Sequence, residues 1–173
     1  MDRKFLTTIL PRSKNLSIQS VLILGIGNTL LSDEGVGVHV VKRLQALHGE
    51  LKGVEYMDGG TLSFTLAEPI ARAEGLIVVD AARMDSSPGT VRVFHNEKMD
   101  RYLSGNRQSV HEVGLTDLLD ISRLTDQLPV QRVLVGIEPE SLDWGESPSE
   151  TVLPAIDRAV GEILSILRKW GKK

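Results

Sequence analysis

The apolar residues of the chain form short continuous runs that alternate with longer segments of helical periodicity. Continuous apolar runs are typical of strands buried on both faces of a parallel sheet, and residues 21–24, 75–79 and 133–137 fit this pattern. Residues 54–57 form a shorter second strand, and residues 90–94 alternate only partly, as an edge strand does. The pattern therefore predicts an α/β architecture with a largely parallel sheet.

Helical segments separate the predicted strands. The first has an apolar face over residues 36–47, and the last has one over residues 156–167. Pro154 is expected to bend the early turns of the last helix. Residues 96–108, by contrast, are polar and irregular, which indicates a surface loop.

Three helix starts are indicated by capping residues, which accept hydrogen bonds from the unpaired N–H groups of a first turn. Thr61 is placed to cap a helix that ends near residue 72. Ser109 with Glu112, and Ser147 with Glu150, form two capping boxes, in which a glutamate follows the cap residue by three positions.

Composition and charge exclude several classes of function. The 173 residues carry a net charge of -3, so nucleic acid is not an expected partner. The chain has no cysteine, which excludes disulfides, thiolate metal sites and a cysteine nucleophile. No apolar run is long enough to span a membrane. We expect a cytoplasmic, monomeric protein with one domain over residues 21–170, preceded by a loosely ordered extension over residues 1–20.

Carboxylates stand at or shortly after four of the predicted strand ends, at Glu34, Asp58, Asp80 and Glu138. The carboxyl ends of parallel strands lie along one edge of the sheet, so these acids should gather on one side of the molecule. In open α/β sheets, ligands bind at that edge. The positions of the acids therefore indicate a site.

Several common active-site motifs are incomplete in this chain. Gly25 and Gly27 begin a dinucleotide-binding G-x-G-x-x-G pattern, but Leu30 stands where its third glycine belongs. Acidic residues at the start of the following helix would also repel a pyrophosphate. Phosphate-loop and G-x-S-x-G nucleophile motifs are missing, and Leu115 replaces the second histidine of an H-E-x-x-H motif.

Two carboxylates and one imidazole remain as a candidate metal triad: Glu34, Asp80 and His111. Their O, O, N donor set suits a borderline divalent ion such as nickel or zinc, and three protein ligands leave positions open for water or substrate. His111 is expected at a helix N-terminus, where the helix dipole disfavours the charged imidazole. The neutral form that remains is the one that binds metals.

Five segments together closely resemble the nickel-iron hydrogenase maturation endopeptidases. They are G-I-G-N-T-L-L-S-D-E-G-V-G at residues 25–37, D-G-G-T at residues 58–61, the strand-end Asp80, His111, and G-I-E-P-E-S at residues 136–141. They occur in the family's order at compatible spacing. The resemblance extends from about Val21 to Leu167 and leaves out only the N-terminal extension and the last few residues.

The resemblance implies a specific reaction and fold. Members of that family remove a short C-terminal peptide from the precursor of the hydrogenase large subunit, after nickel has been inserted into it. Their fold is a single domain with a twisted, mostly parallel five-stranded sheet and helices on both faces. The family's metal-contacting residues match Glu34, Asp80 and His111. The nickel is expected to come with the precursor and not to be retained by the protease.

Other residues in these motifs have alternative interpretations. Asp33 is placed as a helix N-cap, which is the favoured interpretation, and it is alternatively a catalytic base. Asp58 either makes its own Asx turn or contacts substrate, and it too is a candidate base. Further candidate substrate-binding residues are Gly27, Asn28, Gly59, Gly60 and Thr61.

Three functions follow from these features. The first is a protease in which the metal polarises the scissile carbonyl, activates a water, or only positions the bond while Asp33 or Asp58 acts as base. The second is a nickel-checking chaperone that docks on the precursor without cutting it. The third is a nucleotide-binding α/β protein, which the missing third glycine argues against.

Overall fold

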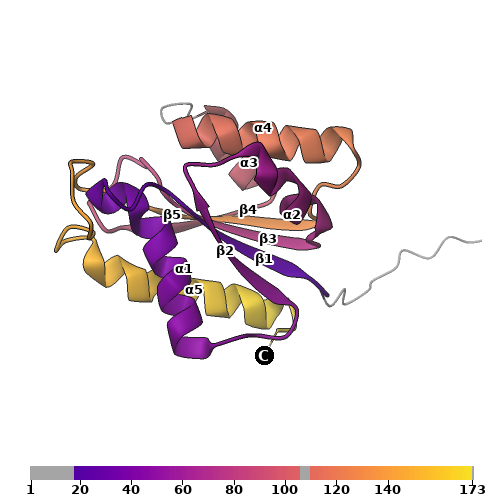
Figure 1. Cartoon of the computed structure of the whole chain (residues 1–173), viewed down its shortest axis with the longest axis horizontal. Coiled ribbons are helices and arrows are strands. Elements are labelled where there is room, and N and C mark those ends of the chain that lie inside the picture. The colour runs from indigo at the N-terminus through magenta and orange to yellow at the C-terminus, as the bar shows by residue number, and fades with distance from the viewer. Residues whose placement is uncertain (1–17, 106–109, 173) are drawn as a thin grey trace, which may run out of the picture.

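One five-stranded sheet forms the centre of the computed structural model, which describes residues 18–105 and 110–172, with only the backbone of residues 110–113 (Figure 1). The strands lie in the order β2-β1-β3-β5-β4. Strand β4, at one edge, pairs antiparallel with β5, and the other neighbouring strands pair in parallel. The strand bounds are Val21–Ile26 for β1, Val54–Gly60 for β2, Gly75–Ala81 for β3, Val91–His95 for β4 and Gln131–Ile137 for β5.

Helices cover both faces of the sheet, as Figure 1 shows. Helices α1 (Val36–His48) and α5 (Leu153–Lys169) lie on one face. The other face carries α2 (Ala67–Arg72), α3 (Glu97–Gly105) and α4 (Val110–Leu124). Two short 3-10 helices precede α1 and α2, namely η1 (Ser32–Gly35) and η2 (Phe64–Leu66). The predicted single-domain α/β fold and its edge strand are therefore confirmed.

Alternate residues of the strands supply two separate cores. All six residues of β1 are buried, as the continuous apolar run predicts. Val21 and Ile23 pack toward α1 and α5, whereas Leu22 and Leu24 pack toward the opposite helices. This period of two is the geometry of a strand covered on both faces.

The loop predicted over residues 96–108 is wrong for most of its length, because residues 97–105 form α3. Met99 and Leu103, one turn apart, are both buried, and the rest of the helix is largely polar. Two inward positions are a weak periodic signal, so tertiary packing decides this helix more than its own sequence does. Residues 106–108 lie outside the described part of the chain.

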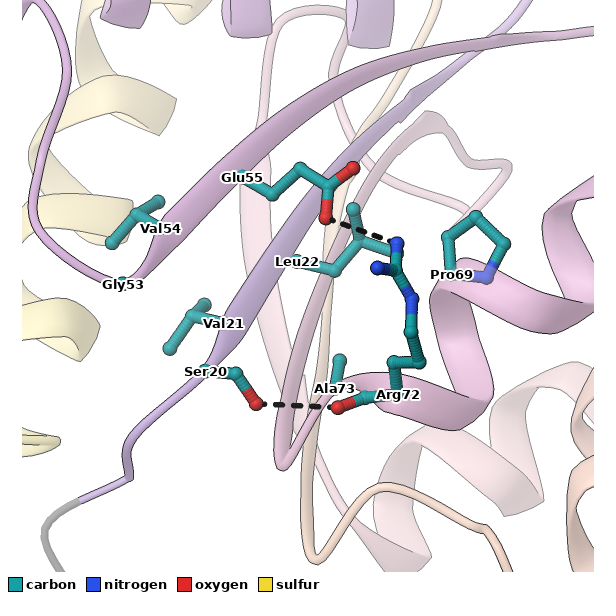
Figure 2. A pocket seen from close by; sticks show the side chains of 9 residues that line it. All are labelled: Ser20, Val21, Leu22, Gly53, Val54, Glu55, Pro69, Arg72 and Ala73. Atoms are coloured by element: carbon teal, nitrogen blue, oxygen red, sulfur yellow. Dashed lines mark hydrogen bonds and ion pairs between the residues drawn. The ribbon is translucent and has the colours of Figure 1, made fainter.

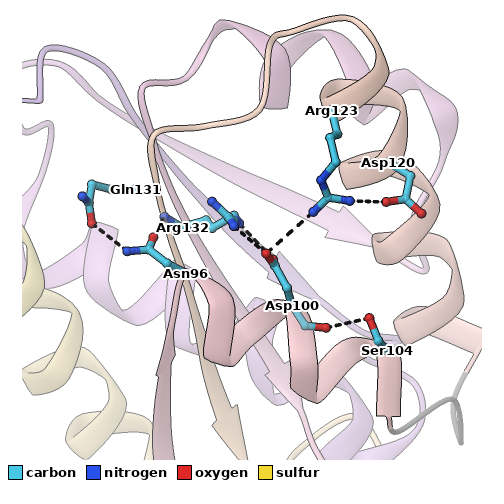
Figure 3. Close-up of polar contacts among 7 residues, drawn as sticks. All are labelled: Asn96, Asp100, Ser104, Asp120, Arg123, Gln131 and Arg132. Atoms are coloured by element: carbon cyan, nitrogen blue, oxygen red, sulfur yellow. Dashed lines mark hydrogen bonds and ion pairs between the residues drawn. The ribbon is translucent and has the colours of Figure 1, made fainter.

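Charge pairing holds α3 against the sheet (Figure 3). Asp100 accepts hydrogen bonds from two guanidinium nitrogens of Arg132 on β5, and the Nε–Oδ1 distance is 2.9 Å. Arg123 of α4 forms an ion pair with the same carboxylate at 3.6 Å. The hydrogen bonds to Asp100 raise the pKa of Arg132 in spite of its burial. Asp100 thus joins two helices and a strand.

The cap predicted at Thr61 is wrong, since the chain enters η2 two residues later. Ser63 is the N-cap of η2, and its hydroxyl accepts a hydrogen bond from the backbone N–H of Thr65 at 3.3 Å. Thr61 lies instead on the turn that leaves β2. Ser109, the cap predicted for α4, lies outside the described residues.

The capping box predicted over Ser147–Glu150 does not form. Helix α5 begins at Leu153, and its N-cap, Val152, makes no side-chain capping hydrogen bond. Pro154 lies in the first turn of the helix, where a missing N–H removes no helical hydrogen bond. Pro154 at this position therefore gives no physical reason for the predicted bend in the helix.

The N-terminal extension predicted for residues 1–20 falls mostly outside the description, which starts at Ile18. Ile18 itself is buried in the core beneath α1 and α5. The N–H of Gln19 donates to the Glu74 carboxylate at 2.6 Å, so the last residues of the predicted extension pack against the domain. Within residues 18–105 and 110–172, no helix is both long and apolar enough to cross a membrane.

The ion pair of Asp100 should contribute measurably to stability. Asp100→Ala leaves the largely buried guanidinium of Arg132 without its partner, so the free energy of unfolding should fall by about 2 kcal/mol. Asp120→Ala is the matched control, because it removes an exposed ion pair to Arg123 and should cost less than about 0.5 kcal/mol. Chemical denaturation of both variants checks this, and equal losses would contradict it.

Candidate functional site

The strand order creates a topological switch point between β1 and β3 at the carboxyl edge of the sheet. The chain leaves β1 through α1 toward β2, whereas it leaves β3 toward β4 and β5 on the other side. Ligands of open α/β sheets usually bind in a crevice at such a point. Glu34 follows β1, and Asp80 lies near the end of β3. The two predicted carboxylate ligands therefore come from the two strands of the switch point.

Two glycines allow η1 and α1 to sit directly on the strand ends. Gly27 has a φ of 126°, and a Cβ atom there would lie 1.8 Å from the backbone oxygen of Glu34. At Gly37, a Cβ atom would lie 2.1 Å from the backbone oxygen of Val79. A side chain at either position would push the helix start, and Glu34 with it, away from the sheet.

Asp80 lies at the point where β3 continues beyond its neighbour. The last residue pair between β1 and β3 joins Gly25 to Val79, and Asp80 then pairs only with Gly136 of β5. The side chain is 4% exposed, and η1 packs against β3 at this end. Asp80 is thus a buried acid at the switch point, as the strand-end rule predicts.

Asp33 is a buried structural carboxylate, and the predicted N-cap role is wrong. Its exposure is 0%, and neither η1 nor α1 has a side-chain cap. Its Oδ2 atom accepts hydrogen bonds from the N–H groups of Glu140 at 2.8 Å and Ser141 at 2.9 Å, and from the Ser149 hydroxyl at 2.9 Å. Its Oδ1 atom accepts the N–H of Ser149 at 2.7 Å. Asp33 therefore ties η1 to the loop between β5 and α5.

The loop held by Asp33 also pairs with the β1–η1 loop through the backbone. Leu31 and Gly145 form an isolated parallel bridge, in which Ser32 N–H donates to the Gly145 oxygen at 2.7 Å. Gly145 N–H in turn donates to the Leu30 oxygen at 3.0 Å. Asn28 closes its own turn, since its Oδ1 atom accepts the N–H of Leu30 at 3.0 Å. The two loops form one fixed wall beside Glu34.

Asp58 and Glu138 lie at the predicted edge, but structural contacts engage both carboxylates. Asp58 accepts the N–H of Gly60 at 3.0 Å, which is the predicted Asx turn, and lies 3.5 Å from the ammonium of Lys42. The buried Glu138 accepts the N–H groups of Met84 at 2.7 Å and Ser86 at 3.2 Å. The edge therefore gathers four acids, of which Glu34 and Asp80 come from the two strands that form the switch point.

The side chain of His111 lies outside the described residues, although its backbone is in the first turn of α4. The metal triad of Glu34, Asp80 and His111 therefore stays a prediction. Among the side chains that the structure does describe, no three histidine, aspartate or glutamate residues form a group that could hold a metal ion.

His39 is a polar residue in the first turns of α1, near the carboxyl edge. Its side chain is half-buried between α1 and β2, and its Nε2 atom is buried without a hydrogen-bond partner. Burial, and secondarily the charge of Lys42, lowers the pKa of His39 below 6.5, and Asp58 partly opposes this. The imidazole is therefore neutral at pH 7.

A separate pocket of about 380 Å³ opens at the opposite, amino edge of the sheet (Figure 2). It is lined by the starts of β1 and β2 and by the end of α2. Arg72 there is engaged by Glu55 at 3.6 Å and by Glu68 at 2.8 Å. Because ligands of this fold bind at carboxyl ends, this pocket is not the candidate site.

Removing the Asp33 carboxylate should destabilise the protein. Asp33→Ala leaves three backbone N–H groups of the β5–α5 loop without their acceptor, at a cost of about 3 kcal/mol. The melting temperature should fall by roughly 6–12 °C, and hydrogen exchange at Glu140, Ser141 and Ser149 should accelerate. Glu146→Ala, an exposed acid in the same loop, is the control. Unchanged exchange in Asp33→Ala would show that the loop is held by other contacts.

The lowered pKa of His39 predicts a loss of stability in mild acid. The unfolded chain takes up a proton near pH 6.5, whereas folded His39 does so only at lower pH. The free energy of unfolding should therefore fall as pH decreases below about 6.5. His39→Gln should lose less stability than the wild type between about pH 7.5 and about pH 5.5. Chemical denaturation at several pH values checks this. If the free energies of unfolding of the wild type and His39→Gln change with pH in parallel, the lowered pKa of His39 is contradicted.

Comparison with known proteins places this chain in a family. A sequence model of the family described as hydrogenase maturation protease matches residues 38–166. HoxM, a hydrogenase expression/formation protein of Cupriavidus necator, is 36% identical over 152 residues, which cover 87% of this chain and 75% of HoxM. The hydrogenase 2 maturation protease of Escherichia coli is also 36% identical, over 87% of this chain and 92% of its own.

Solved structures support the same family assignment as the sequence comparisons. The hydrogenase maturating endopeptidase HybD from Escherichia coli superposes with a TM-score of 0.84 and 35% identity, over 89% of this chain and 95% of that chain. The [NiFe] hydrogenase maturation protease HybD from Thermococcus kodakarensis gives a TM-score of 0.73 with 27% identity, over 85% of this chain and 98% of that chain. The chain therefore belongs to the hydrogenase maturation protease family, whose members are hydrolytic enzymes.

Proposed function

We propose that this protein is an endopeptidase that removes the C-terminal extension from the precursor of a nickel-iron hydrogenase large subunit. The proposal includes recognition of nickel already inserted into the precursor, through Glu34, Asp80 and His111. Nickel is then part of the substrate and not a resident cofactor of the protease. The precursor is the expected protein partner.

The observation that carries the proposal is the position of Glu34 and Asp80 at the switch point of the sheet. The two carboxylates come from the ends of the two strands that form the switch point, and Asp80 is almost completely buried. Oxygen ligands from these two residues and a neutral imidazole from His111 suit a divalent metal carried by a substrate.

The surrounding residues have supporting roles in this proposal. Asp33 and the two paired loops fix the backbone at Glu34, which keeps the carboxylate in place without a substrate. Asp33 is engaged by four hydrogen bonds, which leaves it poorly suited to act as a base. Of the two candidate bases, Asp33 and Asp58, we therefore retain Asp58, whose side chain is half-exposed at the end of β2. Gly27, Gly59, Gly60 and Thr61 lie on the same edge, where a substrate backbone would pass.

The alternative functions lack comparable support. A nucleotide-binding role requires a glycine at position 30, where the chain has an exposed leucine, and it requires a phosphate near acidic Glu34. A chaperone that docks without cutting is disfavoured by membership in a family of proteases. The two hypotheses predict different products, since only a protease shortens the precursor.

Glu34→Gln and Asp80→Asn should abolish cleavage of the nickel-loaded precursor, with losses in kcat/KM of about a hundredfold or more. Both variants keep the shape of the side chain, and Glu34→Gln should keep the wild-type melting temperature. Intact-mass measurement of the large subunit after incubation detects the loss of the C-terminal peptide. His111→Ala should have the same effect.

Precursor without nickel is the matched substrate control. It should be cut at least about a hundredfold more slowly than loaded precursor, because the triad then has no cation to engage. Equal cleavage of both substrates would refute nickel recognition. Full activity of Glu34→Gln or His111→Ala would refute the triad, and an unchanged mass in every reaction would refute the protease itself.

A further inference from the structure

A small apolar pocket opens beside the candidate site, between the turn that follows β2 and helix α4. Its volume is about 150 Å³, and Leu62, Phe64 and Leu118 form its apolar walls. Gly114, three residues after His111 in α4, also lines it. The lining of this pocket begins at Thr61, directly after Gly60, the last residue of β2, so the pocket adjoins the carboxyl end of that strand.

Phe64 has no structural role that explains its exposure. Its side chain is 74% exposed, whereas Leu66 in the same short helix is buried in the core. A phenylalanine left in water forgoes the stabilisation that burial would give. Aromatic side chains are enriched where proteins bind other proteins. Phe64 is therefore better explained by an intermolecular contact than by the fold.

The position of Leu62 is maintained against an unfavourable backbone conformation. Its φ is 66°, which a branched side chain rarely adopts, and its N–H donates to the Gly59 oxygen at 3.0 Å. On the opposite side, a Cβ atom on Gly114 would lie 3.3 Å from the Leu62 Cδ1 atom. Backbone strain of this kind collects at ligand sites, where it orients the groups that bind. A strained leucine and a helix glycine thus shape the pocket together.

The size of the pocket limits what it can hold. Sites for small-molecule ligands occupy roughly 300–1,000 Å³, which is well above this volume. An apolar cavity of about 150 Å³ accommodates a group the size of benzene. The walls are aliphatic and aromatic, and the polar Ser63 and Asp117 also line the pocket. One apolar side chain of a larger partner fits this description.

We propose that this pocket is a specificity subsite that receives one apolar side chain from the C-terminal segment of the precursor, close to the bond that is cut. The inference rests on the proposed function. The pocket begins at Thr61, directly after Asp58, Gly59 and Gly60 at the carboxyl end of β2, so a peptide bound at this end of the sheet lies next to the pocket. Phe64 covers the bound side chain on its exposed side.

Phe64→Ala tests the subsite in the full-length protein with nickel-loaded precursor. The KM for cleavage should rise about tenfold, because the bound side chain loses its aromatic cover. The kcat should stay within about twofold of the wild type, because the contact is equally strong before and during the reaction. Leu124→Ala is the matched control, since Leu124 is 86% exposed at the end of α4 and lines no part of the pocket. Its kinetics should equal those of the wild type.

Two further measurements identify the contact. Phe64→Leu keeps an apolar cover and should recover most of the lost KM. Apolar precursor residues near the cut are then changed to alanine one at a time. One of these changes should raise KM about tenfold with the wild-type enzyme and have no additional effect with Phe64→Ala.

The outcomes separate the subsite from the proposed function. If the wild type shortens the precursor and Phe64→Ala does so with unchanged KM, the subsite is refuted while the protease stands. If no precursor position couples to Phe64, the subsite is refuted as well. If the wild type does not shorten loaded precursor, both proposals fail together.

Discussion

The buried carboxylate of Asp33 is the interaction on which the geometry of the carboxyl edge depends. It accepts four hydrogen bonds from a loop more than 100 positions later in the chain, at Glu140, Ser141 and Ser149. Each of these donors would otherwise lose its water without compensation. The backbone bridge between Leu31 and Gly145 adds a second connection between the same loops. Because Glu34 follows Asp33 directly, these contacts determine where the backbone of the candidate ligand lies.

The sheet and its first crossover could be predicted from local patterns, because each such element is specified by its own residues. The continuous apolar run of β1 and the period of α1 need no partner to be recognised. Helix α3 could not be recognised in this way, since two buried positions and an ion pair to Arg132 on β5 specify it. The capping box at Ser147 failed for a related reason. Helix α5 begins only at Leu153, and Ser149, inside the predicted box, donates to Asp33, a distant buried acceptor that a local motif does not reveal.

Part of the site follows from one rule, that strand ends of a parallel sheet share an edge. The rule predicted that Glu34 and Asp80 lie at the carboxyl edge, where the structure has them, but it did not distinguish them from Asp58 and Glu138. The strand order makes that distinction, since β1 and β3 form the switch point, whereas Asp58 lies on β2 and Glu138 follows β5. Leu62 and Phe64 belong to no sequence motif, so the sequence did not indicate the pocket. Their signal is a positive φ and an exposed aromatic ring, which only coordinates reveal.

The rigid edge and the proposed subsite have different physical consequences for recognition. Groups that must first become ordered lose binding free energy, so a metal held by a substrate is bound more tightly by ligands on a fixed backbone. The Asp33 contacts fix the backbone next to Glu34. An apolar subsite, in contrast, discriminates weakly, since one methylene changes the binding free energy by only about 1–3 kcal/mol. In the proposed arrangement, the crevice would therefore distinguish loaded from empty precursor, whereas the pocket beside Phe64 would set which part of the precursor lies at the crevice.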